Sequence, residues 1–257
     1  MVAGAKPLLG ADRKTPTFGK SAREFLEQVR SAPYDREDLG QFFAFAAGLA
    51  KQSKGQLFQD LWALWETGMN APGYFVEFGA ADGVYLSNSY LLETTYGWKG
   101  VLAEPNPASA PLVRAARNCF ISDKCVFNRS GEHIAFLPAV MGELSRIRDI
   151  VPDDTHERSG RRLGEASKEI QVETISLNDL LIEAQAPQRI DYMSVDTEGS
   201  EFAILSTFDF ERWDVRAISV EHNFTLLREQ LFELLTAAGY RRKFRQFSRF
   251  DDWYVRD

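Results

Sequence analysis

A chain of 257 residues with 44% hydrophobic and 26% charged residues has the composition of an ordinary globular protein. The net charge of −7 argues against a general nucleic-acid binder, because contacts with backbone phosphates rely on a basic surface. No apolar run approaches the roughly 20 residues that span a bilayer, and two cysteines cannot form a disulfide framework. We therefore expect a cytoplasmic protein without a membrane span.

Residues 1–71 precede the main pattern of the chain. Residues 1–19 lack the apolar core of a signal peptide and are predicted to be frayed or disordered. Residues 20–71 are predicted to form a helical extension, whose aromatic face repeats at helical spacing through Leu57, Phe58, Leu61, Trp62 and Trp65. Such a face packs on the main domain, or it serves as a lid, a pocket wall or the surface of a homodimer.

From residue 72 to residue 257, strand-like and helix-like runs alternate. The predicted strands are 74–79, 100–104, 125–128, 190–196 and 216–222, and the predicted helices are 86–96, 108–117, 176–185, 200–206 and 224–238. This alternation predicts a parallel sheet with helices on both faces. Two closing runs, 240–249 and 252–255, predict an antiparallel hairpin at the sheet edge. The expected fold class is α/β, with a mostly parallel seven-stranded sheet.

A polar, charged segment at about residues 142–169 interrupts this pattern. Loops of this length inside compact domains are usually lids or disordered segments. We expect a flexible insertion, either a mobile flap over the active site or a plain solvated loop.

A glycine turn follows the first predicted strand, in the sequence Val76-Glu-Phe-Gly-Ala-Ala-Asp-Gly83. Glycines after a buried strand let the backbone approach a ligand closely. Dehydrogenases carry G-x-G-x-x-G at this place, and this turn lacks the middle glycine that makes room for a pyrophosphate. With Glu77 two residues ahead of it, the turn suits an amino-acid ligand such as S-adenosylmethionine. A tight βα turn without a ligand is the alternative.

An acid at the tip of the second predicted strand supports a nucleotide site. Glu104 follows Gly83 by about 20 residues, the separation at which a carboxylate holds the diol of a ribose. Two signals at the right separation favour a cofactor site more strongly than either signal alone.

Polar side chains also end the fourth and fifth predicted strands. Asp196 and Glu198 follow the run that begins at Ile190, and Glu221, His222 and Asn223 end the next run. We expect these five side chains to converge on one cleft, because ligands of open α/β sheets bind outside the carboxyl ends of the strands. Simple helix capping would explain one residue at each tip and leave the others without a role.

Taken together, these motifs resemble the FkbM family of S-adenosylmethionine-dependent methyltransferases. The resemblance runs from about residue 72 to residue 256, and it includes Ser87-Asn-Ser-Tyr-Leu-Leu-Glu93, Trp98 to Pro107, Ser176 to Leu180, Asp191 to Glu201, Val220 to Asn223 and Asp251 to Val255. It implies a Rossmann-like class I methyltransferase fold. It also implies O-methylation of a hydroxyl on a sugar, a glycan or a polyketide-like small molecule. No motif of the family matches the 142–169 segment.

The resemblance also implies roles for single residues. Glu104 would hold the ribose hydroxyls, Asn106 would lie near the adenine, and Asp196 would lie beside the methyl group and the acceptor. The residues around the methionine part of the cofactor would be Glu77, Gly79, Ala81, Asp82 and Gly83, with Ser87 and Asn88 on the facing helix.

An alcohol is a weak nucleophile until its proton leaves, so a base or a metal ion is expected. His222 is the preferred base because its unperturbed pKa lies near 6.5, and Asp196 and Glu198 complete the predicted catalytic group. A second hypothesis places Mg²⁺ on Asp196, Glu221 and Asn223. A nicotinamide-dependent oxidoreductase and a non-catalytic cofactor-binding module of the same fold are the competing classes.

Overall fold

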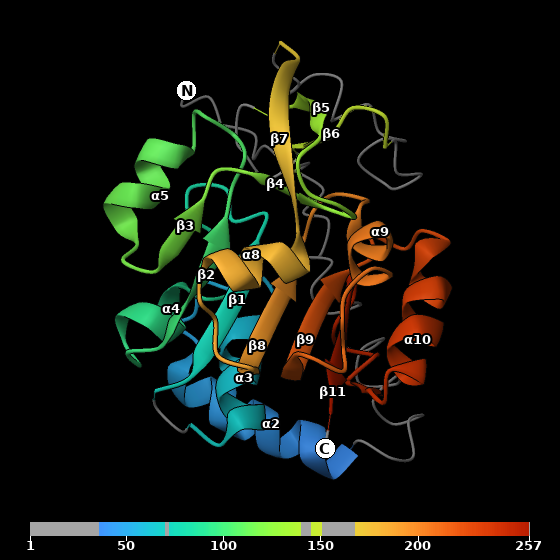
Figure 1. The fold of residues 1–257 in the computed structure, drawn as a ribbon. Coiled ribbons are helices and arrows are strands. Elements are labelled where there is room, and N and C mark those ends of the chain that lie inside the picture. The colour runs from blue at the N-terminus through green and yellow to red at the C-terminus, as the bar shows by residue number, and fades with distance from the viewer. Residues whose placement is uncertain (1–35, 70–71, 140–144, 151–167, 257) are drawn as a thin grey trace, which may run out of the picture.

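The computed structural model describes residues 36–69, 72–139, 145–150 and 168–256. Its centre is a seven-stranded sheet in the order β10-β11-β9-β8-β1-β2-β3 (Figure 1). The strands are β1 (Tyr74–Phe78), β2 (Lys99–Ala103), β3 (Phe120–Ser122), β8 (Arg189–Val195), β9 (Asp214–Glu221), β10 (Arg241–Lys243) and β11 (Asp251–Val255). β11 runs antiparallel to both of its neighbours, and the other pairs are parallel. This confirms the predicted Rossmann-like class I methyltransferase fold.

Helices cover both faces of this sheet. Successive side chains of a strand point to opposite faces, so Phe75 and Val76 belong to two different hydrophobic clusters. The cluster around Val76 contains side chains of α8 (Leu177–Glu183), α9 (Glu201–Leu205) and α10 (Leu227–Ala237). The cluster around Phe75 contains side chains of α2 (Arg36–Leu49), α3 (Gln59–Thr67) and α4 (Tyr90–Thr94), while α5 (Ala110–Ala116) packs on Leu102.

The aromatic face of the N-terminal segment lies on the main sheet. Trp62 is fully buried and stacks on Trp253 of β11, with ring centroids 4.8 Å apart. In the same cluster, Phe42 of α2 stacks on Phe244 at 5.6 Å. Offset aromatic pairs of this kind stabilise a fold beyond the area that they bury. α3 therefore occupies the place of a sheet-covering helix. Residues 20–35 of the predicted helical extension lie outside the described residues.

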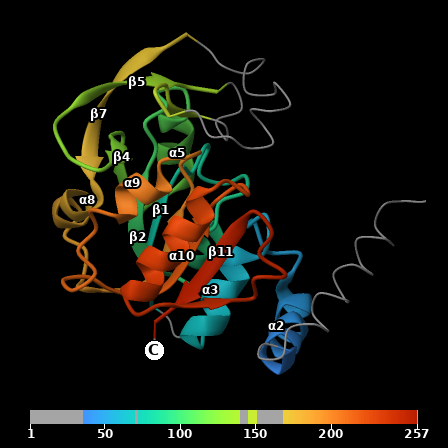
Figure 2. The same ribbon diagram turned by 90° about the vertical axis from the view of Figure 1, so that its right-hand side faces the viewer.

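A second, four-stranded sheet stands beyond the carboxyl ends of the main strands. Its order is β4-β7-β5-β6, and Figures 1 and 2 both place β5 and β7 past one end of the main sheet. Its strands are β4 (Cys125–Phe127), β5 (His133–Leu137), β6 (Arg146–Ile147) and β7 (Ile170–Ser176). Most of the predicted 142–169 insertion lies outside the described residues, but Arg146 and Ile147 within it form a buried strand paired with β5.

Two sequence-based assignments need correction. The predicted strand 125–128 corresponds to β4 of the second sheet. The strand that pairs with β2 in the main sheet is β3, which two residues separate from β4. Two short apolar runs this close together look like one strand, and periodicity cannot assign either run to a sheet. The predicted helix 86–96 begins only at Tyr90, because Leu86 has a positive φ of 56° and residues 87–89 hydrogen-bond to Glu77 instead of continuing a helix. None of the described helices combines the length and apolar character that a membrane crossing requires.

Candidate functional site

The tips of the central strands line up at one edge of the main sheet. Glu104, Gly79 and Asp196 come directly after the last paired residues of β2, β1 and β8. Glu221 is the last residue of β9, and it pairs with Asp251 at the start of β11. Register therefore places four carboxylic acids and one glycine in a single row across five strands. Since ligands bind outside the carboxyl ends of parallel strands, this row marks the candidate site.

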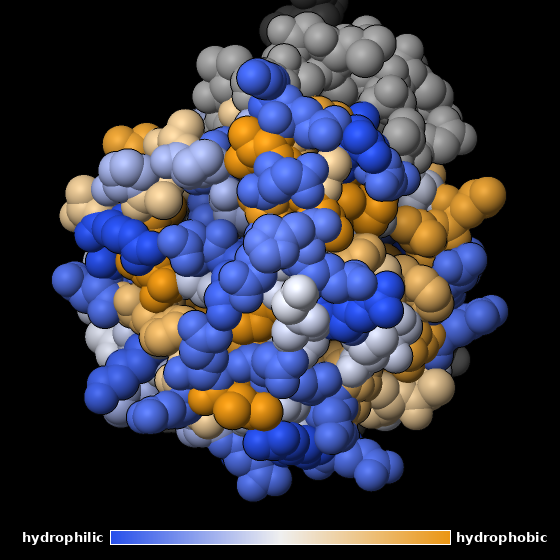
Figure 3. Space-filling model, turned by 45° about the horizontal axis from the view of Figure 1, so that its top comes forward, coloured by the Kyte–Doolittle hydropathy of each residue, from blue (hydrophilic) through white to orange (hydrophobic). Residues whose placement is uncertain are grey.

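Two adjoining cavities lie along the row. The larger has a volume of about 400 Å³, and the smaller of about 40 Å³. Four residues line both cavities, namely Phe78, Gly79, Asp196 and Glu198. The other residues of the larger cavity are Gln56, Gln59, Glu77, Ala80, Ala81, Tyr85, Leu86, Ser87, Asn88, Ser194 and Glu221. Those of the smaller are Ala103, Glu104, Pro105, Cys125, Val126, Phe136, Ser145, Ile147, Thr197 and Ser200. Figure 3 brings this end of the molecule forward, and hydrophilic residues make up most of the surface there.

The turn after β1 is tightly constrained. A Cβ on Gly79 would lie 1.6 Å from the carbonyl oxygen of Asp196, so only glycine fits where β1 and β8 end side by side. Ala81 is held at a φ of 47°, a strained value for a residue with a Cβ. The Asp82 carboxylate accepts hydrogen bonds from the backbone of Val84 at 2.9 Å and Tyr85 at 2.7 Å. Asp82 thus holds the turn, and it does not line either cavity.

Glu77 is buried beneath this turn and is fully partnered. Its carboxylate accepts a hydrogen bond from the Ser87 hydroxyl at 2.8 Å and one from the backbone N–H of Asn88 at 2.7 Å. The Ser89 hydroxyl donates to it as well, and Nη1 of Arg117 lies 3.6 Å away. Glu77 therefore organises residues 87–89, although it also contributes to the wall of the larger cavity.

Asn88 has one unsatisfied polar atom beside the larger cavity. Its Nδ2 donates to the Ser194 hydroxyl at 2.9 Å, while its Oδ1 is buried without a hydrogen-bond partner. A buried acceptor without a donor is costly in a folded protein. Asn88 also lines the larger cavity.

Glu104 lines the smaller cavity, and Asn106 lies two residues further along the chain. The Glu104 carboxyl accepts hydrogen bonds from the backbone N–H groups of Asn106, at 2.8 Å, and Ala81. Burial raises its pKa to about 7, and these bonds only partly oppose that effect. Asn106 does not line the cavity, because its side chain bonds to the backbone of Ala108 and Ala139.

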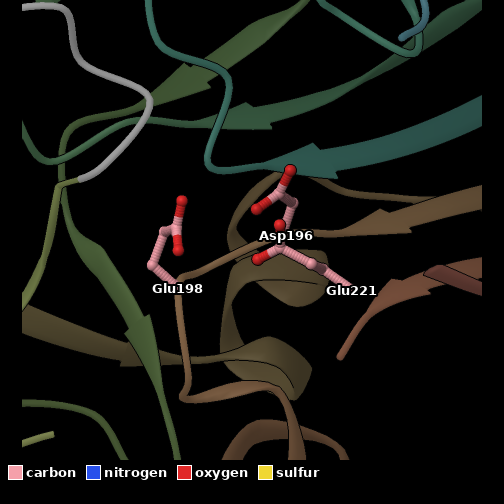
Figure 4. A group of neighbouring side chains, drawn as sticks. All are labelled: Asp196, Glu198 and Glu221. Atoms are coloured by element: carbon pink, nitrogen blue, oxygen red, sulfur yellow. The ribbon is translucent and has the colours of Figure 1, made fainter. Parts of the chain in front are cut away.

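Three carboxylates come together at the tips of β8 and β9. One oxygen each of Asp196, Glu198 and Glu221 lies within 4.8 Å of the other two. In Figure 4 the carboxylates of Asp196 and Glu221 lie side by side, and Glu198 faces them from the following turn. Glu198 has a positive φ of 60°, a backbone conformation that concentrates at functional sites.

The pKa values of two of these groups are raised. Burial raises the pKa of Asp196 well above its usual range, and the charge of Glu198 adds to this effect. Burial does the same for Glu221, with Asp196 as the next contributor. Within the described part of the chain, no Lys or Arg makes an ion pair with Asp196 or Glu221. A cation, a proton or a hydrogen-bond donor would relieve this repulsion.

His222 points away from the three carboxylates. It directly follows Glu221, the last residue of β9, and its side chain lies beside Asp252. Asp252 pairs with Val220, which faces the opposite side of the sheet from Glu221. Nδ1 accepts a hydrogen bond from the Phe224 backbone at 2.9 Å, and Nε2 faces Asp252 at 3.8 Å. Burial lowers the pKa of His222 to about 4. Because Nδ1 accepts this hydrogen bond, the neutral ring carries its proton on Nε2. It therefore has no free lone pair with which to take a proton from a substrate hydroxyl.

The structure thus brings together Asp196, Glu198 and Glu221 and separates His222 from them. Asn223 remains near the group, since its amide lies 3.5 Å from an oxygen of Glu198. Sequence analysis missed the buried Arg117 and Asp251. Nothing in the sequence marks Arg117, but Asp251 lies inside the family motif at residues 251–255 and could have been placed opposite Glu221 by strand pairing.

Comparison with known proteins identifies the family. A model described as the methyltransferase FkbM domain matches residues 77–242. The chain belongs to the FkbM methyltransferase family. The match begins at Glu77 and includes the glycine turn, Glu104 and the carboxylates of β8 and β9. The chain is therefore a methyltransferase by family.

Two solved structures are similar to the FkbM chain at low identity. One is a mutant of the protein named MtNAS, with 14% identity and a TM-score of 0.35 over 93% of this chain and 70% of the other. The second is MtNAS in complex with MTA and tNA, with 14% identity and a TM-score of 0.34 over 92% and 70%. Similarity at this level identifies neither a ligand nor a reaction for this chain. No curated protein matches the chain.

Proposed function

We propose that this FkbM-family protein is an S-adenosylmethionine-dependent O-methyltransferase, which acts on a hydroxyl of a sugar, a glycan or a polyketide-like small molecule. The observation that carries the proposal is the row of strand tips, because it joins a buried acid at a small cavity to three carboxylates at a large one. The position of the row agrees with the general ligand site of open α/β sheets.

The residues along the row fit the cofactor. Glu104 would accept hydrogen bonds from the two ribose hydroxyls, and the apolar walls of the smaller cavity, such as Phe136 and Ile147, suit a base. In the larger cavity, acidic and amide side chains of the wall, among them Asn88, would contact the ammonium group of the methionine part. When bound, the cofactor supplies an electrophilic methyl group on a sulfonium.

The carboxylates would activate the acceptor. Asp196 and Glu221 lie at the larger cavity with raised pKa values, so each binds a proton more readily than an exposed carboxyl does. Such a group takes up the proton that the acceptor hydroxyl loses, a role that contributes roughly 10²–10⁴-fold to a reaction rate. The position of His222 on the other face favours these carboxylates over the imidazole as the base.

A hard divalent cation such as Mg²⁺ is the second candidate for activating the hydroxyl. The ligands would be Asp196, Glu198 and Glu221, with Glu198 in the place that the sequence suggested for Asn223. Carboxylate oxygens suit such an ion, which would lower the pKa of a bound alcohol. Full activity after EDTA treatment and repurification would exclude the metal.

The first test is isothermal titration of the protein with S-adenosylhomocysteine, with NAD in parallel and Glu104→Ala as the control. We expect micromolar binding of S-adenosylhomocysteine that is lost in the variant, and no binding of NAD. Affinity should fall as pH drops below about 7, because a protonated Glu104 loses its charge and part of its capacity to accept hydrogen bonds from the ribose. Binding of NAD alone would revive the oxidoreductase hypothesis, and cofactor binding without any turnover would indicate a non-catalytic module.

A further inference from the structure

One buried arginine contacts both ends of the loop that carries Asn88. Arg117 follows α5, and its side chain is fully buried. Nη1 donates to the carbonyl oxygen of Gly83 at 3.0 Å and to the Ser87 hydroxyl at 3.1 Å. Nη2 donates to the Ser89 hydroxyl at 2.7 Å. The guanidinium therefore spans the segment from the end of the glycine turn to the start of α4.

The surroundings keep this guanidinium charged and fixed. Nε donates to a Glu93 oxygen at 2.5 Å, and Nη1 lies 3.6 Å from Glu77. Burial alone would lower the pKa of Arg117, but the charge of Glu77 and further contributions from Cys119 and Glu93 raise it above its ordinary value. The rings of Phe75 and Tyr90 lie 5.3 Å and 5.8 Å from the guanidinium carbon, within the range of cation–π attraction.

The loop needs such a support. Ala81 and Leu86 both have positive φ values, of 47° and 56°, which cost free energy and persist only where surrounding contacts hold them. Glu77 holds the loop from the β1 side, and Arg117 holds both the loop and Glu77 from the α5 side. Asn88 lies between these contacts and lines the larger cavity, as does Ser87.

We propose that Arg117 is a positioning residue of the cofactor site, which fixes residues 83–89 so that Ser87 and Asn88 keep their places in the wall of the larger cavity. The inference rests on the proposed function, because the ligand is the amino-acid part of the cofactor. The role needs the planar fork of a guanidinium, since three nitrogens bond to separate acceptors in fixed directions. A lysine would keep the charge and lose this geometry.

The test compares the affinity of the wild-type chain and its Arg117→Ala variant for S-adenosylhomocysteine by isothermal titration. We expect the variant to bind roughly 10- to 100-fold more weakly, because several charge-assisted hydrogen bonds to the loop are lost. Tens of millimolar guanidinium, far below denaturing concentrations, should restore part of this affinity by refilling the vacated site. The same concentration of NaCl should not. Arg114→Ala in α5 is the matched control, because the ion pair of Arg114 with Asp123 is exposed and its loss should not change the affinity.

Arg117→Lys provides a second variant if Arg117→Ala fails to fold. We expect Arg117→Lys to bind S-adenosylhomocysteine about as weakly as Arg117→Ala, because a lysine does not reproduce the geometry of the guanidinium. Hydrogen exchange of the amides at residues 83–90 should speed up in either folded variant, with or without ligand. Unchanged affinity and unchanged exchange in a folded variant would overturn the proposal, and so would a loss of affinity that guanidinium does not reverse. If the wild-type protein binds no S-adenosylhomocysteine, the proposed function fails first, and the role of Arg117 in a cofactor site fails with it.

Discussion

Two parts of the same sheet edge differ in the partners that surround their buried carboxylates. On the β1 side, Glu77 has an arginine nearby and three hydrogen-bond donors around it. On the β8–β9–β11 side, Asp196, Glu221 and Asp251 lie next to one another, and no described Lys or Arg pairs with them. A fully partnered acid stabilises its surroundings, whereas acids grouped without cations cost stability and are retained for chemistry. The comparison supports a structural role for the first side and agrees with the proposed catalytic role of the second.

The largest effect should come from the reactive side. Asp196→Asn keeps the size of the side chain and removes its ability to take up a proton or to bind a cation. We expect turnover to fall by roughly 10²–10⁴-fold, with a much smaller change in the affinity for S-adenosylhomocysteine. Transfer of a radiolabelled methyl group to an acceptor found by screening sugars and natural-product alcohols measures this. Asp123→Asn, an exposed carboxylate, is the control. A variant that keeps half of its turnover would remove Asp196 from the mechanism.

The same change of carboxylate to amide on the supporting side should instead destabilise the protein. Glu77→Gln leaves Arg117 with less compensating charge and places an NH₂ group where three donors need an acceptor. We expect a loss of about 2–4 kcal/mol in the free energy of unfolding, measured by urea denaturation. Glu132→Gln, which breaks a largely exposed pair with Arg129, should lie within about 0.5 kcal/mol of the wild type. Equal stability of Glu77→Gln and the wild type would contradict the supporting role.

Asp251→Asn should stabilise the protein, whereas Glu77→Gln should destabilise it. Burial raises the pKa of Asp251 to about 7, above its value of 3.8 in an unfolded chain, so the folded state holds a proton that the unfolded state releases between these pH values. Stability from this group is therefore lost as pH rises through 7, and the amide avoids that loss. Asn can still accept the hydrogen bond from Gln59.

For Asp251→Asn we expect a gain of about 1–3 kcal/mol at pH 8 that shrinks toward zero near pH 4. Thermal or urea unfolding at both pH values measures the difference. A variant that is less stable than the wild type at pH 8 would show that Asp251 has a partner that this account lacks.

Sequence patterns predicted the main sheet well because its strands are buried on both faces and separated by helices. They also predicted most of the strand-tip residues, since acids at the end of an apolar run are visible without a structure. The second sheet was missed because β4 and β6 are too short for a periodic signal, and because periodicity does not assign a strand to a sheet. Arg117 was missed for another reason. Its partners lie 24 to 34 residues earlier in the chain, and only the packing of α5 against the turn brings them together.

One error was avoidable from the sequence. Side chains alternate along a strand, so Glu221 and His222 cannot both face the same cavity while β9 stays extended. The prediction that Glu221 and His222 share one cleft assumed that residues adjacent in sequence have side chains on the same side of the sheet. The pairing of Asp251 with Glu221, and of Asp252 with Val220, repeats the same division on β11. Asp252 therefore lies on the His222 face, as the 3.8 Å separation of their side chains shows.

The smallest effect should follow the replacement of His222, the base that the sequence suggested. In His222→Asn, the amide oxygen can accept the Phe224 N–H in place of Nδ1, so the loop after β9 is preserved. We expect turnover to stay within about twofold of the wild type, because a base would contribute roughly 10²–10⁴-fold. The pH profile of turnover between 6 and 8 should not change either, since His222 with a pKa of about 4 stays neutral over that range. Steady-state kinetics with the acceptor used for Asp196→Asn decides the matter. A hundredfold loss in a folded variant would return catalysis to His222 and would mean that the strand tip rearranges when substrate binds.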